Sequence, residues 1–598
     1  MPKSLLDYYQ ENLEYMRDLG SDFTKEFPKI ASRLELSENE CGDPFVERLL
    51  EGAAFLAARV ERKLDRSVPY MLESVLNGVL PYALEPIPAF AIAELRDWDR
   101  SNVPAVQVLQ AHTLYEAVPE GCRTPCTFST MIPVTLFPVE LTEARYLTLD
   151  LQKYELNAEA GLYLKFRKNA PFSIDPKADE LLFYLDMTGA MASALQQHLQ
   201  TECTGVTVIS NGQREAAEEI HFSIPMLDEK NACDQNNNPV TGRELFHQFA
   251  VFQPLFRFLR IHGLAARLNR INDGDTVELV ITFRRRRMEF FQRIDNRILR
   301  MNCVPLCNLF RKKSDRIPMT IRDQHHLVPD RTNPLSYEVA RVLSVSLFDN
   351  GNRKILDLHR IYDTDYMEEE DSFNFYSVRR LPRQRGDTER ERSSYVGQEV
   401  YLSFSGETFQ QLQSNVVQFS ADILCTNRDL PLLLHSGSVL KAREPAIFQT
   451  AVLLTAPTAP DLPLISGSGA DYAEKAACLM VNFSDFLWSD GVIPRELLRK
   501  MIHARIPDSR ENLAGLERSI LSLKNIRETF RYVRQGQVFF ESGWRIEVEL
   551  DEPSCAGIGS YIFGCLLREF LKSYKPINTP GKIVLTTKQQ GRICEWMI

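Results

Sequence analysis

The spacing of apolar residues changes near residue 89, and this change limits the folds that are open to the chain. Before it, apolar residues from Leu5 to Leu19 recur at steps of three and four, which places them on one face of a helix. After it, runs such as 90–95 alternate with a period of two, as half-buried strands do. Pro86 and Pro88 stiffen the boundary. We therefore expect a helical start followed by β-rich structure.

A second helix has a clear start. Asp43 can cap the backbone, and Pro44 suits the first helical position because its missing N–H has no partner there. The apolar face of this helix extends over 46–64. A third, short helix is expected over 70–80, ending before Pro81.

Strand patterns dominate the middle of the chain. Short strands at even spacing up to residue 300 predict a sandwich or barrel, and 337–348 and 399–404 alternate in the same way. Between these two, 362–397 is polar, with an acidic cluster and an arginine-rich stretch, which predicts a long surface loop. Residues 455–469 are rich in proline, glycine and serine, and we expect a linker there.

The C-terminal part mixes helices and strands. Apolar spacing predicts helices over 495–504 and 513–529, then a strand, a helix and a strand over 545–550, 560–573 and 582–587. The predicted fold class is multidomain α+β, with an N-terminal helical segment, central β-rich modules of sandwich or barrel type and a C-terminal α/β segment. The predicted domains are a helical segment 1–88, a β-rich module 89–300, a second β-rich module with a long arginine-rich loop 301–470, and a helical and β-α-β module 471–598.

Motifs that carry chemistry are missing from the sequence. It contains no P-loop, no Gly-x-Ser-x-Gly nucleophile motif and no His-Glu-x-x-His zinc motif. The pairs Cys122/Cys126 and Cys303/Cys307 lack the two-residue spacing of most zinc sites, and we expect small buried hydrophobes. No catalytic residue, cofactor or metal site is predicted. The sequence also lacks a signal run and a membrane-length apolar stretch, so a cytoplasmic protein is expected.

A glycine-rich segment near the C-terminus has two possible interpretations. Gly557-Ile-Gly559 follows a predicted strand and opens a predicted helix, which is the context of a dinucleotide-binding fingerprint. Ile562 stands where that fingerprint has its third glycine. We therefore predict a tight strand-to-helix turn with close helix–sheet packing at Gly564.

Arg284–Arg287 is the strongest basic run, and its function stays open at this point. Phe283, Phe290 and Phe291 interleave with the arginines and could stack nucleic-acid bases. The chain has a net charge of −10, which argues against a protein that wraps nucleic acid. The alternatives are nucleic-acid binding, contact with another protein through the arginine side chains, and a solvated face.

Eight segments, in order from near the first residue to near the last, have distinctive sequences: Tyr8–Arg17, Phe27–Leu34, Asp43–Asp65, Leu80–Ala89, Asn302–Phe310, Leu327–Val339, Cys425–Pro431 and Gly557–Tyr574. In these segments the chain resembles the TssF family. Residues 478–486 depart from the family's pattern, which leaves the contacts of that segment open.

The resemblance implies a structural role in the baseplate of the bacterial type VI secretion system. In this family two TssF copies and one TssG form a wedge, and wedges with TssK and TssE ring the VgrG spike and support the TssB–TssC sheath. It implies no catalytic residue, no cofactor and no nucleic acid. The expected location is the cytoplasm, at the inner face of the inner membrane when assembled, with membrane contact only through partners.

Two groups of residues are predicted to contact partner subunits. Phe45, Leu49 and Phe55 belong to a helix whose Leu/Val face is already complete, so apolar surface is left for a partner helix. The alternative, that all of it packs internally, stays open. Arg379 and Arg380 begin the arginine-rich stretch, which we expect to touch acidic surfaces of neighbouring subunits.

Overall fold

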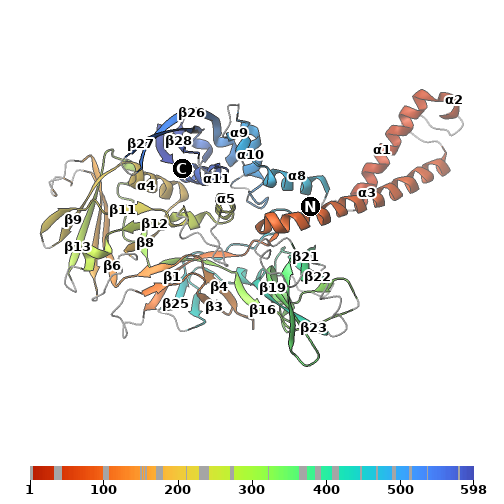
Figure 1. Ribbon diagram of the computed structural model, residues 1–598, viewed down its shortest axis with the longest axis horizontal. Helices are drawn as coiled ribbons and strands as arrows, with labels where there is room; N and C mark the ends of the chain where they lie inside the picture. Colours follow the sequence, from red (N-terminus) through yellow and green to blue (C-terminus); the bar gives the residue numbers. More distant parts are fainter. Residues whose placement is uncertain are drawn as a thin grey trace.

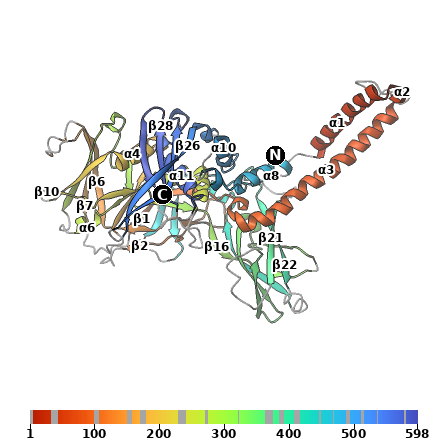
Figure 2. The same ribbon diagram turned by 45° about the horizontal axis from the view of Figure 1, so that its top comes forward.

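A helical arm projects from a body built mostly of β-sheets in the computed structural model of this protein, and a second view shows the same projection (Figures 1 and 2). The arm consists of α1 (Leu5–Glu26), α2 (Pro28–Ala31) and α3 (Pro44–Val79). The structure describes residues 5–31, 43–98, 107–148, 151, 154, 158–169, 179–210, 212–227, 241–269, 275–320, 322–361, 374–383, 392–406, 416–444, 448–466, 469–487, 493–510, 513, 515–534, 537–555, 557–576 and 579–598.

The start of α3 agrees with its sequence, but its length does not. The Asp43 carboxylate accepts a hydrogen bond from the Phe45 N–H at 2.8 Å, and Pro44 occupies the first turn. The prediction of a separate helix over 70–80 is wrong, because α3 continues through Pro69 and ends at Val79. A proline inside a helix costs about 3 kcal/mol. The helix bears this cost because it packs against α1 before Pro69 and against α8 after it.

Six strands from distant parts of the sequence close into a barrel. The ranges 89–300 and 301–470 both contribute strands to it, and the division of the chain into domains stays a prediction. A separate two-stranded antiparallel sheet consists of β2 (Gln107–Leu109) and β5 (Val134–Leu136). In order around the barrel, the strands are β1 (Phe90–Trp98), β15 (Cys303–Cys307), β4 (Cys126–Thr130), β3 (Leu114–Ala117), β24 (Val439–Ala442) and β25 (Phe448–Leu453).

Two antiparallel sheets form a sandwich at the end of the body opposite the arm (Figure 1). Alternate residues of both sheets share one apolar core with α4 (Gly189–Thr201) and α6 (Ala265–Asn269), so the predicted sandwich and barrel architecture is confirmed. The first sheet has the order β10 (Gln213–Ala216), β9 (Cys203–Ser210), β13 (Thr276–Phe283), β7 (Ala160–Lys168), β6 (Val139–Leu147). The second has the order β11 (His221–Ser223), β12 (Phe258–His262), β8 (Glu180–Leu185), β14 (Leu299–Met301).

A third sheet lies below the root of the arm and includes a segment that the sequence did not mark as a strand. The prediction of one surface loop over 362–397 is wrong for 374–382, which pair with β22 along their whole length. The acidic cluster Glu368–Asp371 lies outside the described residues. The sheet contains β16 (Phe310–Lys313), β23 (Gln418–Thr426), β19 (Glu338–Phe348), β20 (Lys354–Arg360), β21 (Asn374–Pro382), β22 (Gln398–Gly406) and β18 (His325–His326), with β17 (Ile317–Pro318) beside β23.

The C-terminal sheet confirms one prediction and corrects another. Strand β27 pairs in parallel with β28, and α11 joins them, so the predicted β-α-β unit is confirmed. The predicted helix over 513–529 is wrong, because 520–534 form a strand that pairs with β27. The sheet and its helices are β26 (Ile520–Arg534), β27 (Gln537–Leu550), β28 (Gly581–Thr587), β29 (Gly591–Met597), α11 (Ser560–Lys572), α8 (Gly469–Met480), α9 (Ser484–Leu487) and α10 (Arg495–His503).

The turn into α11 has the close packing that its glycines predict. Gly557 and Gly559 have φ angles of 88° and 92°, which L side chains rarely adopt. A Cβ on Gly564 would lie 2.3 Å from the Leu585 side chain of β28. The prediction of a tight turn with helix–sheet packing at Gly564 is confirmed.

Residues 455–466 do not form the free linker that their composition suggests. The Thr458 and Thr455 hydroxyls accept hydrogen bonds at 2.9 Å from the backbone N–H groups of Phe90 and Ile92 in β1. Asp461 and Ile87 pair through their backbones, with both N–H···O distances at 3.0 Å. The two proline-containing connections therefore lie against each other and fix the barrel to the arm.

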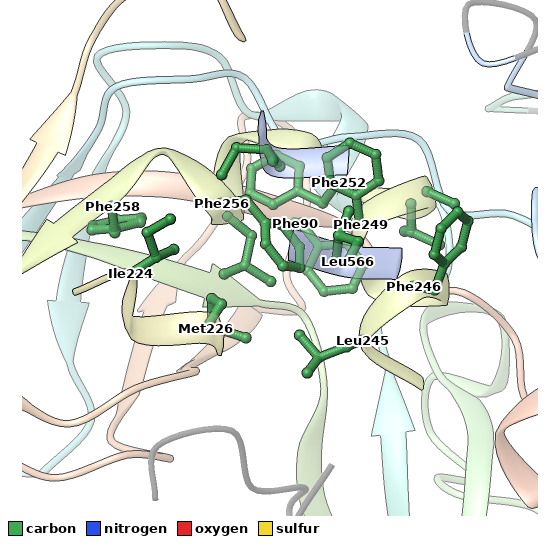
Figure 3. Close-up of a cluster of buried hydrophobic side chains, with 14 of the residues drawn as sticks. Phe90, Ile224, Met226, Leu245, Phe246, Phe249, Phe252, Phe256, Phe258 and Leu566 are labelled. Carbon is green, nitrogen blue, oxygen red and sulfur yellow. The ribbon is translucent and has the colours of Figure 1, made fainter. Parts of the chain in front are cut away.

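A cluster of phenylalanines joins the barrel to the C-terminal sheet (Figure 3). Phe246 of α5 (Gly242–Val251) is fully buried, and its ring lies 6.1 Å from that of Phe563 and 6.2 Å from that of Phe570 in α11. Phe90 of β1 stacks on Phe252 at 5.6 Å. The large rings make this contact well packed. Among the described residues, no helix has the length and apolar character needed to cross a membrane.

We predict that Phe246→Ala lowers the free energy of unfolding by about 3–5 kcal/mol, because it leaves a cavity between α5 and α11. Phe540→Ala is the matched control, since that ring is 70% exposed. Chemical denaturation followed by tryptophan fluorescence gives both values. Equal midpoints for the two variants would contradict the assigned role of Phe246.

Candidate interaction surfaces

Helices α1 and α3 meet along a narrow seam. Ala54 and Ala58 are fully buried on α3, and such small side chains let two helices approach closely. Polar side chains then fix the register: the Tyr8 hydroxyl donates to Asp65 at 2.8 Å, and the Asn12 amide donates to Glu61 at 2.6 Å. The arm is therefore a paired structure and not an isolated helix.

The opposite side of α3 carries an apolar stripe that the described part of the chain leaves open. Phe45 and Leu49 are 82% and 74% exposed, and the stripe continues along the helix at steps of seven and four. At 3.6 residues per turn these positions share a face, on the other side of the helix from Ala54 and Ala58. We call this set the arm stripe, and its members are Phe45, Leu49, Leu56, Val60 and Leu64.

Phe55 lies at the edge of the seam and not on the arm stripe. Its ring meets that of Tyr9 edge-on at 6.5 Å, and 43% of the residue stays exposed. The structure thus places Phe45 and Leu49 together on one exposed face, with Phe55 on a flank. Their contact with a partner stays a prediction.

The root of the arm is held on one side by apolar packing. Leu76 of α3, the capping residue Leu80 and Leu84 of η2 (Pro81–Leu84) are buried. They pack in one cluster with Ile465, which belongs to the segment 455–466, and with Tyr472 of α8. This cluster ties the arm to the C-terminal half of the chain.

The other side of the root is held by polar contacts. The Arg341 guanidinium of β19 donates two hydrogen bonds to the Glu85 carboxylate, at 2.6 and 3.0 Å. The Arg360 guanidinium of β20 donates to the Asn77 side chain at 3.0 Å. Two strands of the third sheet therefore hold the last turns of α3 and the residues that follow it.

Arg380 belongs to the same junction. Its backbone N–H donates to the Glu73 carboxylate of α3 at 3.0 Å, and its guanidinium donates to the carbonyls of Val339 and Ala340. Burial raises the pKa of Glu73 against the opposing effect of Arg380, and burial lowers the pKa of Arg380. The neighbouring Arg379 donates to Gln324 at 3.4 Å. Both arginines thus have partners inside the chain, and their contact with a neighbouring subunit stays a prediction.

The basic run Arg284–Arg287 lies between β13 and β14, and the side chain of Arg287 is paired with a carboxylate of the same chain. The Arg287 guanidinium donates to the Glu202 carboxylate at 3.0 Å, and Glu202 also contacts the buried ring of His198 at 2.8 Å. His198 in turn lies 3.1 Å from the Tyr146 hydroxyl. Burial opposes ionisation of Glu202, but the hydrogen bonds from His198 and Arg287 outweigh it and lower its pKa to about 2.

The described residues contain no group of three His, Cys, Asp or Glu side chains placed to hold a metal. Cys126, Cys303 and Cys307 are buried, Cys122 is partly buried, and burial raises the pKa of the Cys126 thiol to about 12. Cys126, Cys303 and Cys307 are thus small buried hydrophobes, as predicted.

The arm stripe can be predicted from the sequence, but the polar contacts at the root of the arm cannot. An apolar helix with residues on two faces is visible in the sequence. The partners in the junction are 256 residues apart for Arg341 and Glu85, and 307 apart for Arg380 and Glu73. Charged residues at such separations do not reveal their pairing.

Comparison with known proteins assigns a family. Residues 1–598 match the family model described as "Type VI secretion system, TssF". Type VI secretion system component TssF1 of Pseudomonas aeruginosa is 29% identical over 622 residues, which cover 100% of this chain and 98% of that protein.

Solved structures share the fold. A chain in the cryo-electron microscopy structure of a type VI secretion system TssK-TssF-TssG baseplate subcomplex aligns with a TM-score of 0.69 and 18% identity, over 92% of this chain and 98% of that one. A chain in the baseplate complex from the type VI secretion system aligns with a TM-score of 0.55 and 16% identity, over 98% of both chains.

We predict that Arg341→Met lowers the free energy of unfolding by about 2–3 kcal/mol, because it leaves the Glu85 carboxylate half-buried without its guanidinium. The double variant Arg341→Met with Glu85→Gln should recover most of that loss. Arg17→Met, which breaks an exposed pair with Glu47 on the arm, is the control and should change stability by about 0–1 kcal/mol. Losses that simply add in the double variant would refute a coupled pair.

Glu202 gives a pH prediction. Because its pKa falls from 4.5 to about 2 on folding, the ionised carboxylate stabilises the fold above pH 4.5, and this stability is lost as the pH falls towards 2. Glu202→Gln should lower the unfolding free energy at pH 7 by about 3 kcal/mol, and the gap from wild type should close below pH 4.5. Glu120→Gln, at an exposed position, is the control. A gap that stays constant from pH 7 to 3 in denaturation midpoints would contradict the assignment.

Proposed function

We propose that this chain, which belongs to the TssF family of the type VI secretion system, is a structural component of the baseplate of that system. Its full-length match to the family supports the proposal. So does its fold, which is that of chains in solved baseplate complexes. The role is assembly and not catalysis.

The observation that carries the proposal is the arm stripe. Five large apolar residues on a projecting helix are exposed, whereas a helix with apolar residues on two sides is ordinarily covered on both. A helical partner laid along the stripe would bury these residues as a third helix of a bundle. The arm stripe is therefore the proposed contact with a partner subunit.

The proposed partners are subunits named in a solved complex that contains a chain of this fold. One fold neighbour is part of a TssK-TssF-TssG subcomplex, so we take TssG and TssK as partners of this chain. The family resemblance further supports a wedge with two copies of this chain and one TssG. TssE, the VgrG spike and the TssB–TssC sheath are more distant neighbours in the same proposal. The wedge would stand in the cytoplasm, at the inner face of the inner membrane.

The two-sided root gives the arm a mechanical role in this proposal. Apolar packing holds the arm to the body on one side. On the other side it is held by the Arg341–Glu85 ion pair and by the hydrogen bond from the Arg380 N–H to Glu73. Residues 455–466 are hydrogen-bonded to the barrel, so they do not supply a hinge. Switching of a baseplate built from such chains would then occur at contacts between subunits, which are bistable in many assemblies.

We predict that Leu49→Asp with Leu56→Asp abolishes assembly with a TssG-type partner without unfolding the chain. Each leucine loses about 1.5–3 kcal/mol of burial in the complex, so the affinity should fall by about 100-fold or more. Both residues are exposed in the free chain, and the thermal midpoint should therefore stay near that of wild type.

The experiment is co-expression with TssG and TssK, affinity purification and mass determination of the complex. Gln10→Asp, an exposed position on α1, is the matched control and should assemble like wild type. A double variant that still assembles at two copies to one TssG would exclude the arm stripe as the contact. Wild-type chain that is monomeric beside TssG and TssK would refute the proposed function itself.

A further inference from the structure

The loop between β13 and β14 concentrates positive charge in an acidic chain. Residues 284–298 contain six arginines against two carboxylates, while the whole chain has a net charge of −10. We call residues 284–298 the arginine loop. It lies on the sandwich, at the end of the body opposite the arm (Figure 1).

Most of the charge in the arginine loop is exposed and unneutralised. Arg284, Arg285, Arg286 and Arg297 are exposed, and no ion pair within the described part of the chain involves their side chains. Arg287 differs, since Glu202 and Glu289 pair with it. Adjacent like charges repel one another, so this arrangement favours an anionic ligand.

The loop is held in place from below. Phe290 and Ile294 are buried in the sandwich core. The Arg284 N–H donates to the Glu202 carbonyl at 2.9 Å, and the Arg287 N–H donates to the Tyr146 hydroxyl at 3.0 Å. A surface fixed at several points loses little backbone entropy when it binds, which favours specific recognition.

Apolar side chains lie among the exposed arginines. Met288 and Phe291 are 60% and 39% exposed. Arginine with methionine and phenylalanine is the composition enriched at protein interfaces. The loop therefore fits an acidic protein segment that carries apolar residues of its own.

The chain contains such a segment. Residues 363–371 read Asp-Thr-Asp-Tyr-Met-Glu-Glu-Glu-Asp, with six carboxylates and an interleaved Tyr366-Met367 pair. They connect β20 to β21, and both views place β21 and β22 at the other end of the body from β6 (Figures 1 and 2). We propose that the arginine loop of one copy of this chain binds the acidic run 363–371 of another copy. The contact rests on the proposed function only in that a baseplate brings several copies together.

The test uses the full-length chain and a fluorescein-labelled peptide of residues 361–373. Fluorescence anisotropy should show saturable binding that weakens as salt is raised. Arg285→Glu with Arg286→Glu should weaken binding by about tenfold or more. Arg123→Glu with Arg353→Glu makes the same charge change at two other exposed arginines and should leave binding near wild type.

The outcomes separate the alternatives. If Arg285→Glu with Arg286→Glu lowers the thermal midpoint, Arg285→Gln with Arg286→Gln replaces it and should weaken binding in the same direction. The proposal is overturned by no binding of the peptide, by equal binding of a peptide with Asn and Gln in place of its carboxylates, or by loss of binding in the Arg123/Arg353 control alone. Tighter binding of a short DNA duplex or of phosphatidylserine vesicles to the same loop would overturn it in favour of that ligand. None of these results depends on TssG or TssK, so failure here leaves the proposed function standing.

Discussion

The two-faced helix α3 is the constraint on which the rest of the structure depends. One face is satisfied by α1 through Ala54 and Ala58, and the other, with Phe45 and Leu49, is exposed. A helix of 36 residues is about 54 Å long, so its far end can stay clear of the body only if its root is held firmly. The third sheet, the barrel connections and α8 all meet at that root.

The root combines two kinds of interaction with different consequences. Apolar packing of Leu76, Leu80 and Tyr472 supplies stability without strong directional preference. The Glu85–Arg341 ion pair adds little net stability, because desolvation of the charges offsets their attraction. It does fix geometry, since a bidentate guanidinium–carboxylate pair tolerates little rotation. Glu73 adds a hydrogen bond from the Arg380 backbone N–H. The direction of the arm is thus set by charge and its attachment by apolar contact.

Much of the local structure could be predicted from the sequence, because its causes are local. The cap at Asp43, the turn before α11 and the β-α-β unit each follow from residues a few positions apart. The segments whose secondary structure was predicted wrongly depend on pairing with other strands. Leu516 and Ile520 have helical spacing and are buried, yet Leu516 begins a 3₁₀ turn and Ile520 begins a strand that exists because β27 pairs with it. Strand β21 is polar and became a strand through β22, and barrel closure joins β1 to β25 across more than half of the chain.

The same distinction applies to the interaction surfaces, and it bears on how copies of this chain could associate. The arm stripe was predictable because surplus apolar residues are visible on a helical wheel. The arginine loop was not, because only the folded structure shows that Arg287 is paired while Arg284–Arg286 are exposed. The two surfaces lie at opposite ends of the molecule (Figure 1). A contact between the arginine loop of one copy and the acidic run of another joins unlike patches, and such heterologous contacts close into rings or extend as open arrays. The arm, in contrast, gathers a few chains around one bundle, so the two surfaces together would let small bundles be linked laterally.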